Sequence, residues 1–165
     1  MQKSFMNLSL GKGIDGKLSI KALDEMPHLL VAGSTGSGKS VGVNDFILSL
    51  MYQNSPSELK FLMVDPKQVE LAMYEGTPYL LAPIITQPDK ALKLLKRAAH
   101  HMDERYNLLK EQKVRNLAEY NKKFSQESLA RVVIVIDELA DLMMSGNKKE
   151  TEGVITRIAQ KARAV

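Results

Sequence analysis

One glycine-rich segment constrains the fold of this chain more than any other feature. It reads Gly33-Ser34-Thr35-Gly36-Ser37-Gly38-Lys39-Ser40 and matches G-x-x-x-x-G-K-[ST] at every required position. An apolar run precedes it, and a helical pattern follows it to about Met51. Glycines permit the backbone angles and close approach with which a loop wraps a polyanion in its N–H groups. The segment therefore predicts a phosphate-binding loop within a strand–loop–helix unit.

The residue types of this loop predict how it binds ATP. The amides of residues 36–40 are expected to point at the phosphates, Lys39 to charge-pair with the β- and γ-phosphates, and Ser40 to join a Mg²⁺ shell. The alternative is a glycine-rich hairpin loop with a surface lysine. The predicted nucleotide-binding residues are Gly33, Ser34, Thr35, Gly36, Ser37, Gly38, Lys39, Ser40 and Val41.

A second motif follows the aliphatic run Val132–Ile136, which ends in Asp137-Glu138. An Asp in this position of a phosphate-loop protein holds Mg²⁺, usually with the loop serine. We predict Asp137 and Ser40 as metal ligands, with Glu138 and Lys39 as the catalytic pair. Glu138 would orient the water that attacks the γ-phosphate, which favours ATP hydrolysis over a GTP switch. Two solvated acids at a strand end are the alternative.

The apolar pattern predicts an α/β fold. Three short continuous apolar runs, rather than alternating ones, are typical of a parallel sheet covered on both faces. The runs are Leu29–Ala32, Phe61–Val64 and Val132–Ile136. Alternation on either side of residues 11–16 predicts a β-hairpin before the first run.

The clearest helix is predicted after Thr86-Gln87-Pro88-Asp89, with Thr86 as its cap, Pro88 in the first turn and Asp89 at the positive end of the dipole. It should extend over about 20 residues, because its apolar residues repeat at steps of three and four. They are Leu92, Leu95, Ala99, Met102, Tyr106 and Leu109.

Composition excludes several classes of protein. The 165 residues correspond to about one domain, and the absence of cysteine removes disulfides, thiolate metal sites and cysteine nucleophiles. No apolar run approaches the roughly 20 residues of a membrane span, and the polar start lacks a signal-peptide pattern. The net charge of +4 conceals a basic segment, residues 90–123, with ten Lys and Arg against four Asp and Glu. That segment is either a solvated helix face or a face for a nucleic acid or another acidic partner.

The motifs together resemble the FtsK/SpoIIIE family of DNA translocases. The resemblance covers nearly the whole chain in order and is specific. The matching segments are residues 28–44, 65–67, 102–106, 114–116, 135–144 and 159–164.

The resemblance implies a RecA-like P-loop ATPase that pumps double-stranded DNA during cell division or sporulation. It also implies that the full protein works as a ring of copies of itself, a hexamer. It implies a cytoplasmic motor domain whose parent is anchored in the bacterial membrane at the septum, through segments outside this sequence. Residues 1–25 would form an N-terminal hairpin segment and residues 26–165 a P-loop core.

The resemblance also implies that the core continues beyond Val165. In motor ATPases of this kind, a strand carrying a polar γ-phosphate sensor lies between the P-loop strand and the strand before Asp137. We therefore expect the sheet of residues 1–165 to lack a central strand, and the isolated chain to hydrolyse ATP weakly or not at all.

Several assignments stay open. Asp65 and Lys67 fit a nucleotide or subunit-interface role, or equally a turn ion pair. Arg157, Lys161 and Arg163 could reach a neighbour's γ-phosphate, although a solvated helix face is the default. The alternative functions are a nucleotide-binding interaction module without motor activity, and a related ATPase of secretion or conjugation.

Overall fold

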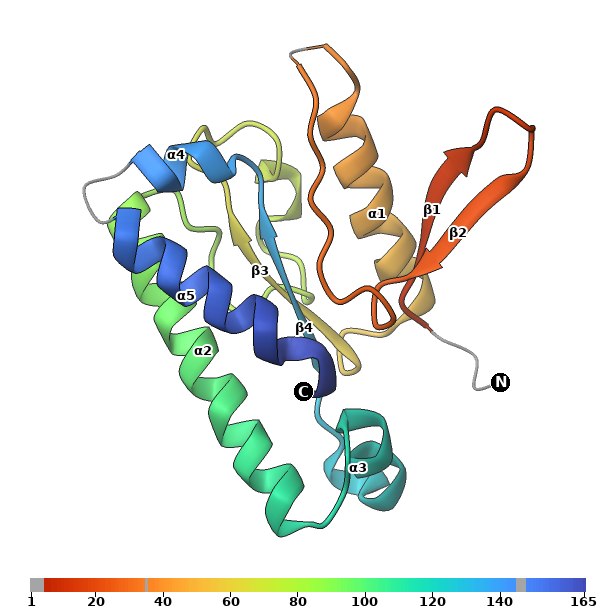
Figure 1. The fold of residues 1–165 in the computed structure, drawn as a ribbon, viewed down its shortest axis with the longest axis vertical. Helices are drawn as coiled ribbons and strands as arrows, with labels where there is room; N and C mark the ends of the chain where they lie inside the picture. The colour runs from red at the N-terminus through yellow and green to blue at the C-terminus, as the bar shows by residue number, and fades with distance from the viewer. Residues whose placement is uncertain (1–4, 35, 145–147) are drawn as a thin grey trace.

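The computed structural model describes residues 5–34, 36–144 and 148–165 and shows an α/β arrangement (Figure 1). The strands and helices alternate after an N-terminal hairpin. In chain order they are β1 (Asn7–Lys12), β2 (Leu18–Ala22), α1 (Lys39–Gln53), β3 (Leu59–Val64), α2 (Pro88–Glu111), α3 (Leu117–Lys123), β4 (Arg131–Ile136), α4 (Leu139–Met144) and α5 (Lys148–Lys161), with short 3-10 turns at Ala72–Tyr74, Ser125–Glu127 and Ala162–Ala164.

The central sheet pairs β3 with β4 in parallel, in a register that joins Leu59 to Arg131 and Val64 to Ile136. On its other edge, β3 is bridged to Leu80 and Ile85 of the loop that leads to α2. The predicted runs Phe61–Val64 and Val132–Ile136 are thereby confirmed as parallel strands.

Both faces of this sheet are covered, as the continuous apolar runs predicted. Val133 and Val135 of β4 pack on the α1 side, whereas Ile134 and Ile136 pack on the α2 and α5 side. In Figure 1, α1 lies on one side of the strands, and α2 and α5 lie together on the other. The result is a three-layer domain.

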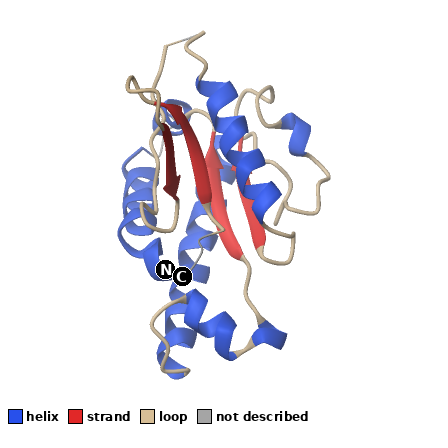
Figure 2. Ribbon diagram, turned by 90° about the vertical axis from the view of Figure 1, so that its right-hand side faces the viewer, coloured by secondary structure: helices blue, strands red, loops and turns tan. Residues whose placement is uncertain are grey.

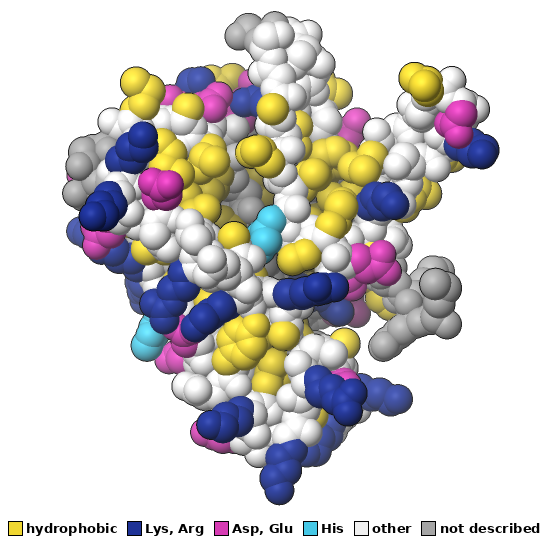
Figure 3. Space-filling view, in the orientation of Figure 1, with side chains coloured by type: hydrophobic (Ala, Val, Ile, Leu, Met, Phe, Trp, Pro, Cys, Tyr) yellow, Lys and Arg dark blue, Asp and Glu magenta, His cyan; other side chains and the backbone are white. Residues whose placement is uncertain are grey.

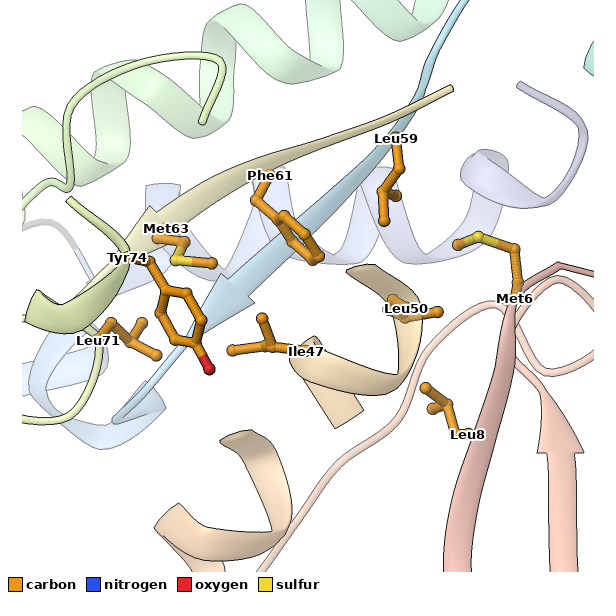
Figure 4. Packing of buried hydrophobic residues seen from close by; sticks show 9 residues of the cluster. All are labelled: Met6, Leu8, Ile47, Leu50, Leu59, Phe61, Met63, Leu71 and Tyr74. Carbon is orange, nitrogen blue, oxygen red and sulfur yellow. The ribbon is translucent and has the colours of Figure 1, made fainter. Parts of the chain in front are cut away.

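The larger core cluster fills the space between the sheet and α1 and extends to the hairpin (Figure 4). Phe61 and Leu59 are fully buried at its centre. The nine buried members are Met6, Leu8, Ile47, Leu50, Leu59, Phe61, Met63, Leu71 and Tyr74.

The antiparallel β1–β2 hairpin confirms the predicted alternation and carries a register shift between Ser9 and Gly11. Figure 2 shows the hairpin and α1 in front of the β3–β4 sheet. The end of α1 anchors the start of the hairpin, because the Gln53 amide both accepts from the Asn7 N–H and donates to the Asn7 carbonyl. Buried Leu8 adds an apolar contact.

The prediction of a first strand at Leu29–Ala32 is wrong. This segment carries no strand assignment, and Leu30 is 79% exposed. A strand needs a neighbour to satisfy its backbone groups. Within the described residues β4 pairs only with β3, so the segment has no strand beside it.

A groove of about 1620 Å³ lies in the place of that missing neighbour. Residues 27–33 form one wall, β4 forms another, and Ile155, Ile158 and Val165 lie along its side. Figure 3 shows hydrophobic side chains gathered on both sides of the hollow in the middle of this face. The described residues therefore leave open space between residues 29–32 and β4.

The long helix α2 is confirmed, but its predicted cap is wrong. The N-cap is Gln87 rather than Thr86, and no side chain caps it. Pro88 occupies the first helical position and forces the residue before it into an extended backbone, so Gln87 must be the boundary. Five of the six residues of the predicted apolar stripe are buried, the exception being Tyr106. In the described part of the chain, no helix is both long enough and apolar enough to cross a membrane.

Candidate nucleotide-binding site

The glycine-rich loop has the geometry of an anion cradle. Gly36 and Gly38 have φ angles of +80° and +87°, a conformation that disfavours any residue with a Cβ. The Ser37 N–H donates to the Ser34 carbonyl at 3.0 Å and closes the turn. Helix α1 begins at Lys39 with Gly38 as its N-cap, so the free N–H groups of its first turn adjoin the loop.

The other described loop residues lie beside these glycines. A Cβ on Gly33 would come within 2.2 Å of the Ser37 hydroxyl, so a larger residue would force Ser37 to move. Ser40 and Val41 lie in the first turn of α1, with Val41 exposed and Ser40 partly buried. Thr35 lies outside the described residues.

The acidic pair meets the loop at the carboxyl end of β4. The Lys39 ammonium donates to Glu138 Oε2 at 3.2 Å and to the Asp137 carbonyl at 3.3 Å, across 99 and 98 residues of chain respectively. The Asp137 N–H donates to the Val64 carbonyl at 3.0 Å and continues the sheet by one bond. The fold thus brings together the lysine and the two acids that sequence spacing alone could not connect.

The charges at this point shift one another's proton affinities. The hydrogen bond between them raises the pKa of Lys39 and lowers the pKa of Glu138. Burial raises the pKa of Asp137, and the carboxylates of Asp65, Glu70 and Glu138 add to that rise while Lys39 opposes it. The site is therefore a cluster of carboxylates around the Lys39 ammonium.

The loop after β3 contributes a second lysine. Lys67 Nζ lies 3.9 Å from Glu138 Oε2 and 3.8 Å from Asp141 Oδ2. Asp65 is fully buried and accepts hydrogen bonds from the N–H groups of Gln68 and Leu71 at 2.9 and 3.0 Å. Asp65 thus braces the loop internally, and Lys67 faces Glu138 and Asp141.

Three further residues at the site were not singled out by the sequence. The charge of Glu70 acts on both Lys39 and Asp137. Tyr74 donates to the Asn44 side chain at 2.7 Å, and Asn44 donates to the Ser40 carbonyl at 3.1 Å. These contacts tie the loop after β3 to the first turns of α1. No sequence motif marks them, because each depends on contacts across the fold.

The donor set fits a magnesium ion only if a nucleotide completes the shell. In the described residues, no group of three or more His, Cys, Asp and Glu side chains could hold a metal by itself. Ser40 and Asp137 supply hard oxygen donors, and Mg²⁺ is commonly held by one or two protein oxygens together with substrate phosphates.

The arginine and lysine candidates of α5 are engaged within the chain. Arg157 forms an ion pair with Asp103 of α2, and Lys161 lies 3.7 Å from the same carboxylate. Arg163 lines the groove beside β4. Part of the basic surface predicted for residues 90–123 is likewise paired, through Lys96 and Glu150.

The fold and the site together define a P-loop nucleotide-binding domain of the α/β class, with a glutamate directly after the aspartate of the second motif. Comparison with known families identifies this domain more narrowly. The profile of the FtsK/SpoIIIE family matches residues 1–165, and the chain belongs to this family.

Curated relatives agree with this assignment. The chain is 51% identical over 162 residues to the "DNA translocase FtsK" of Helicobacter pylori, an alignment that covers 96% of this chain and 19% of the relative. It is 47% identical over 165 residues to that of Campylobacter jejuni, covering 98% of this chain and 17% of the relative. The chain therefore spans roughly a fifth of the length of these relatives.

A solved structure shares the same architecture. The conjugation coupling protein TcpA of pCW3, solved with ATPγS, superposes with a TM-score of 0.82 at 34% identity, covering 99% of this chain and 46% of that protein. This similarity confirms the predicted P-loop fold.

Proposed function

We propose that this chain is the nucleotide-binding part of an ATP-driven motor that moves double-stranded DNA. The observation that carries the proposal is the convergence of Lys39 from the glycine-rich loop with Asp137 and Glu138 from β4. The curated relatives named as DNA translocases support the choice of DNA as the substrate. By analogy with the family resemblance, the motor would work as a ring of copies of the chain.

The geometry suggests how each residue would act in hydrolysis. The N–H groups of residues 36–40 would hold the phosphates, and Lys39 would turn from Glu138 to the β- and γ-phosphate oxygens. Ser40 and Asp137 would hold Mg²⁺, which supplies charge neutralisation on those oxygens. Glu138 would then accept a hydrogen bond from the attacking water and orient it.

The test measures ATP hydrolysis with and without duplex DNA. It uses the chain as it stands and an extended version, which adds the residues that surround this region in its curated relatives. We expect DNA-stimulated turnover in the extended version, its collapse in Glu138→Gln, and weak or absent turnover in residues 1–165. Turnover in the extended version that ignores DNA would contradict the translocase.

The second candidate function is that of an ATPase of conjugation or secretion. The TcpA similarity favours it, as does the type VII secretion ATPase EccC of Thermomonospora curvata, which superposes with a TM-score of 0.77 at 27% identity and covers 99% of this chain and 21% of that protein. The higher identity to translocases over the same residues makes it the lesser candidate. Stimulation by a secreted protein rather than by DNA would reverse this order.

We also propose that the groove beside β4 receives one further parallel strand. The exposed side chains of Leu29 and Leu30 on one wall, and the half-exposed edge of β4 on the other, support this. Hydrogen exchange at the amides of residues 29–32 tests it. Exchange should slow in the extended version, and equally fast exchange in both versions would contradict the proposal.

A further inference from the structure

The Lys39 ammonium is already engaged within the chain. In this structure its ammonium is bound to Glu138 Oε2 and to the Asp137 carbonyl. The same ammonium is the group that the proposed function assigns to the β- and γ-phosphates. When Lys39 turns to a nucleotide, Glu138 loses its principal hydrogen-bond donor at the moment when its orientation matters for the attacking water.

A second ammonium, that of Lys67, lies close to the Glu138 carboxylate. Lys67 Nζ lies 3.9 Å from the Oε2 oxygen that Lys39 now occupies. Its other neighbour, Asp141 Oδ2, lies 3.8 Å away on α4, so Lys67 stands between two carboxylates that follow β4. At these distances Lys67 is a secondary partner of Glu138, ready to become the main one after a small movement.

The loop that carries Lys67 is braced on both sides. At its start, the buried Asp65 carboxylate accepts the N–H groups of Gln68 and Leu71. Gln68 has a φ angle of +57°, the left-handed conformation, which turns the chain directly after Lys67. At its end, Tyr74 is hydrogen-bonded to Asn44 of α1. An ordinary solvated turn does not need these hydrogen bonds. They hold the loop in a fixed conformation, in which the exposed Lys67 side chain lies near Glu138.

We infer that Lys67 is a positioning residue, which holds the Glu138 carboxylate in place once Lys39 has turned to the phosphates of a bound nucleotide. The inference rests on the proposed function, since it assumes that the loop binds ATP. Lys67 acts through Glu138 and does not itself contact the nucleotide. Asp141 Oδ2, 3.8 Å from Lys67 Nζ, is the other acidic neighbour of this ammonium.

The test follows the Glu138 carboxyl directly, by carbon-13 NMR of the chain labelled at glutamate side chains and assigned with Glu138→Gln. Without nucleotide, Lys67→Met should displace this resonance little, because Lys39 still donates to it. With Mg·ATPγS bound, the displacement should be several times larger. Lys67→Arg should restore the wild-type resonance, because it returns the charge to the same place.

Controls separate positioning from a structural effect. Lys110→Ala, at an exposed lysine near the end of α2, should leave the Glu138 resonance unchanged in both states. Because the Lys67 side chain is 58% exposed, removal of its charge should not unfold the chain. A displacement of equal size with and without nucleotide would mean a structural role and would overturn the inference.

Nucleotide affinity separates this inference from the proposed function. The Kd for Mg·ATPγS should change less than about twofold in Lys67→Met, whereas a loss of about tenfold would show that Lys67 binds the nucleotide itself, and would overturn its role as a positioning residue. Failure of the wild-type chain to bind Mg·ATPγS would contradict the proposed function, and the inference with it. Normal binding with an unmoved Glu138 resonance would contradict the inference alone.

Discussion

At the scale of single residues, the most informative side chain outside the glycine-rich loop is Asp65. Its carboxylate is fully buried, yet it forms hydrogen bonds with backbone N–H groups rather than an ion pair. A buried acceptor whose donors are fixed in the backbone is costly to replace, because those donors are left unpaired. Asp65 therefore sets the shape of the loop that presents Lys67.

Replacement of Asp65 by asparagine should destabilise the chain by about 1–3 kcal/mol, because the amide NH₂ faces an N–H group in place of one carboxylate oxygen. Urea unfolding followed by circular dichroism measures the change. Glu152→Gln, an exposed position on α5, provides the matched control and should change stability by less than about 0.5 kcal/mol. Equal effects of the two substitutions would contradict the bracing role of Asp65.

Glu58 provides a prediction about pH. Its carboxylate accepts hydrogen bonds from the Ser55 hydroxyl and N–H at 2.6 and 2.8 Å, and these lower its pKa below the ordinary value of 4.5. A depressed folded-state pKa adds stability above pH 4.5, and this contribution is lost as the pH falls through the folded-state pKa.

Glu58→Gln should therefore lower stability near neutral pH and reduce its decline below pH 4.5. Melting temperatures of both proteins between pH 3 and pH 7 measure this. Parallel curves would show that Glu58 does not contribute.

At the scale of elements, some helices and strands follow from the local sequence pattern, whereas others depend on pairing with a neighbouring strand. The runs that became β3 and β4, the helices α1 and α2, and the hairpin were all predictable from periodicity and from turn residues. Leu29–Ala32 has the same apolar composition as these runs, but it forms no strand, because a strand depends on a neighbour that no local pattern reports.

The candidate site divides in the same way. The glycines, Lys39, Ser40, Asp137 and Glu138 were predictable, because their spacing within each motif is local. The approach of Lys67 to Glu138 joins residues 71 positions apart, and the contact between Tyr74 and Asn44 joins residues 30 positions apart. The parallel pairing of β3 with β4 places their carboxyl ends together and makes the first contact, and the packing of α1 against the sheet makes the second.

Two leucines, one buried and one exposed, test how much each segment contributes to the packed core. Leu95 on α2 is 1% exposed and Leu30 is 79% exposed. Leu95→Ala should reduce the free energy of unfolding by about 2–5 kcal/mol, because it leaves a cavity between α2 and the sheet. Leu30→Ala should change it by less than about 0.5 kcal/mol. A large loss at Leu30 would show that residues 29–32 are packed in the isolated chain.

At the scale of the whole molecule, the nucleotide site joins the start of α1 to the end of β4. The glycine-rich loop precedes α1 and the acidic pair follows β4. The side-chain hydrogen bonds described between them both come from the Lys39 ammonium, which donates to Glu138 Oε2 and to the Asp137 carbonyl. The exposed segment 29–32 and the open groove lie beside this junction. A ligand held by both parts should therefore stabilise the fold as a whole.

Saturation with Mg·ATPγS at about 100 times its Kd should add about 2.7 kcal/mol of stability, or about 5–10 °C in Tm for a chain of this size. Removal of the metal with EDTA should abolish most of this gain, because Ser40 and Asp137 act on the phosphates through Mg²⁺. Ser40→Ala should likewise reduce the gain without lowering the Tm of the free protein, because Ser40 is only partly buried. A shift that EDTA leaves intact would mean that the loop holds phosphates without magnesium, and would remove Ser40 and Asp137 from the metal site.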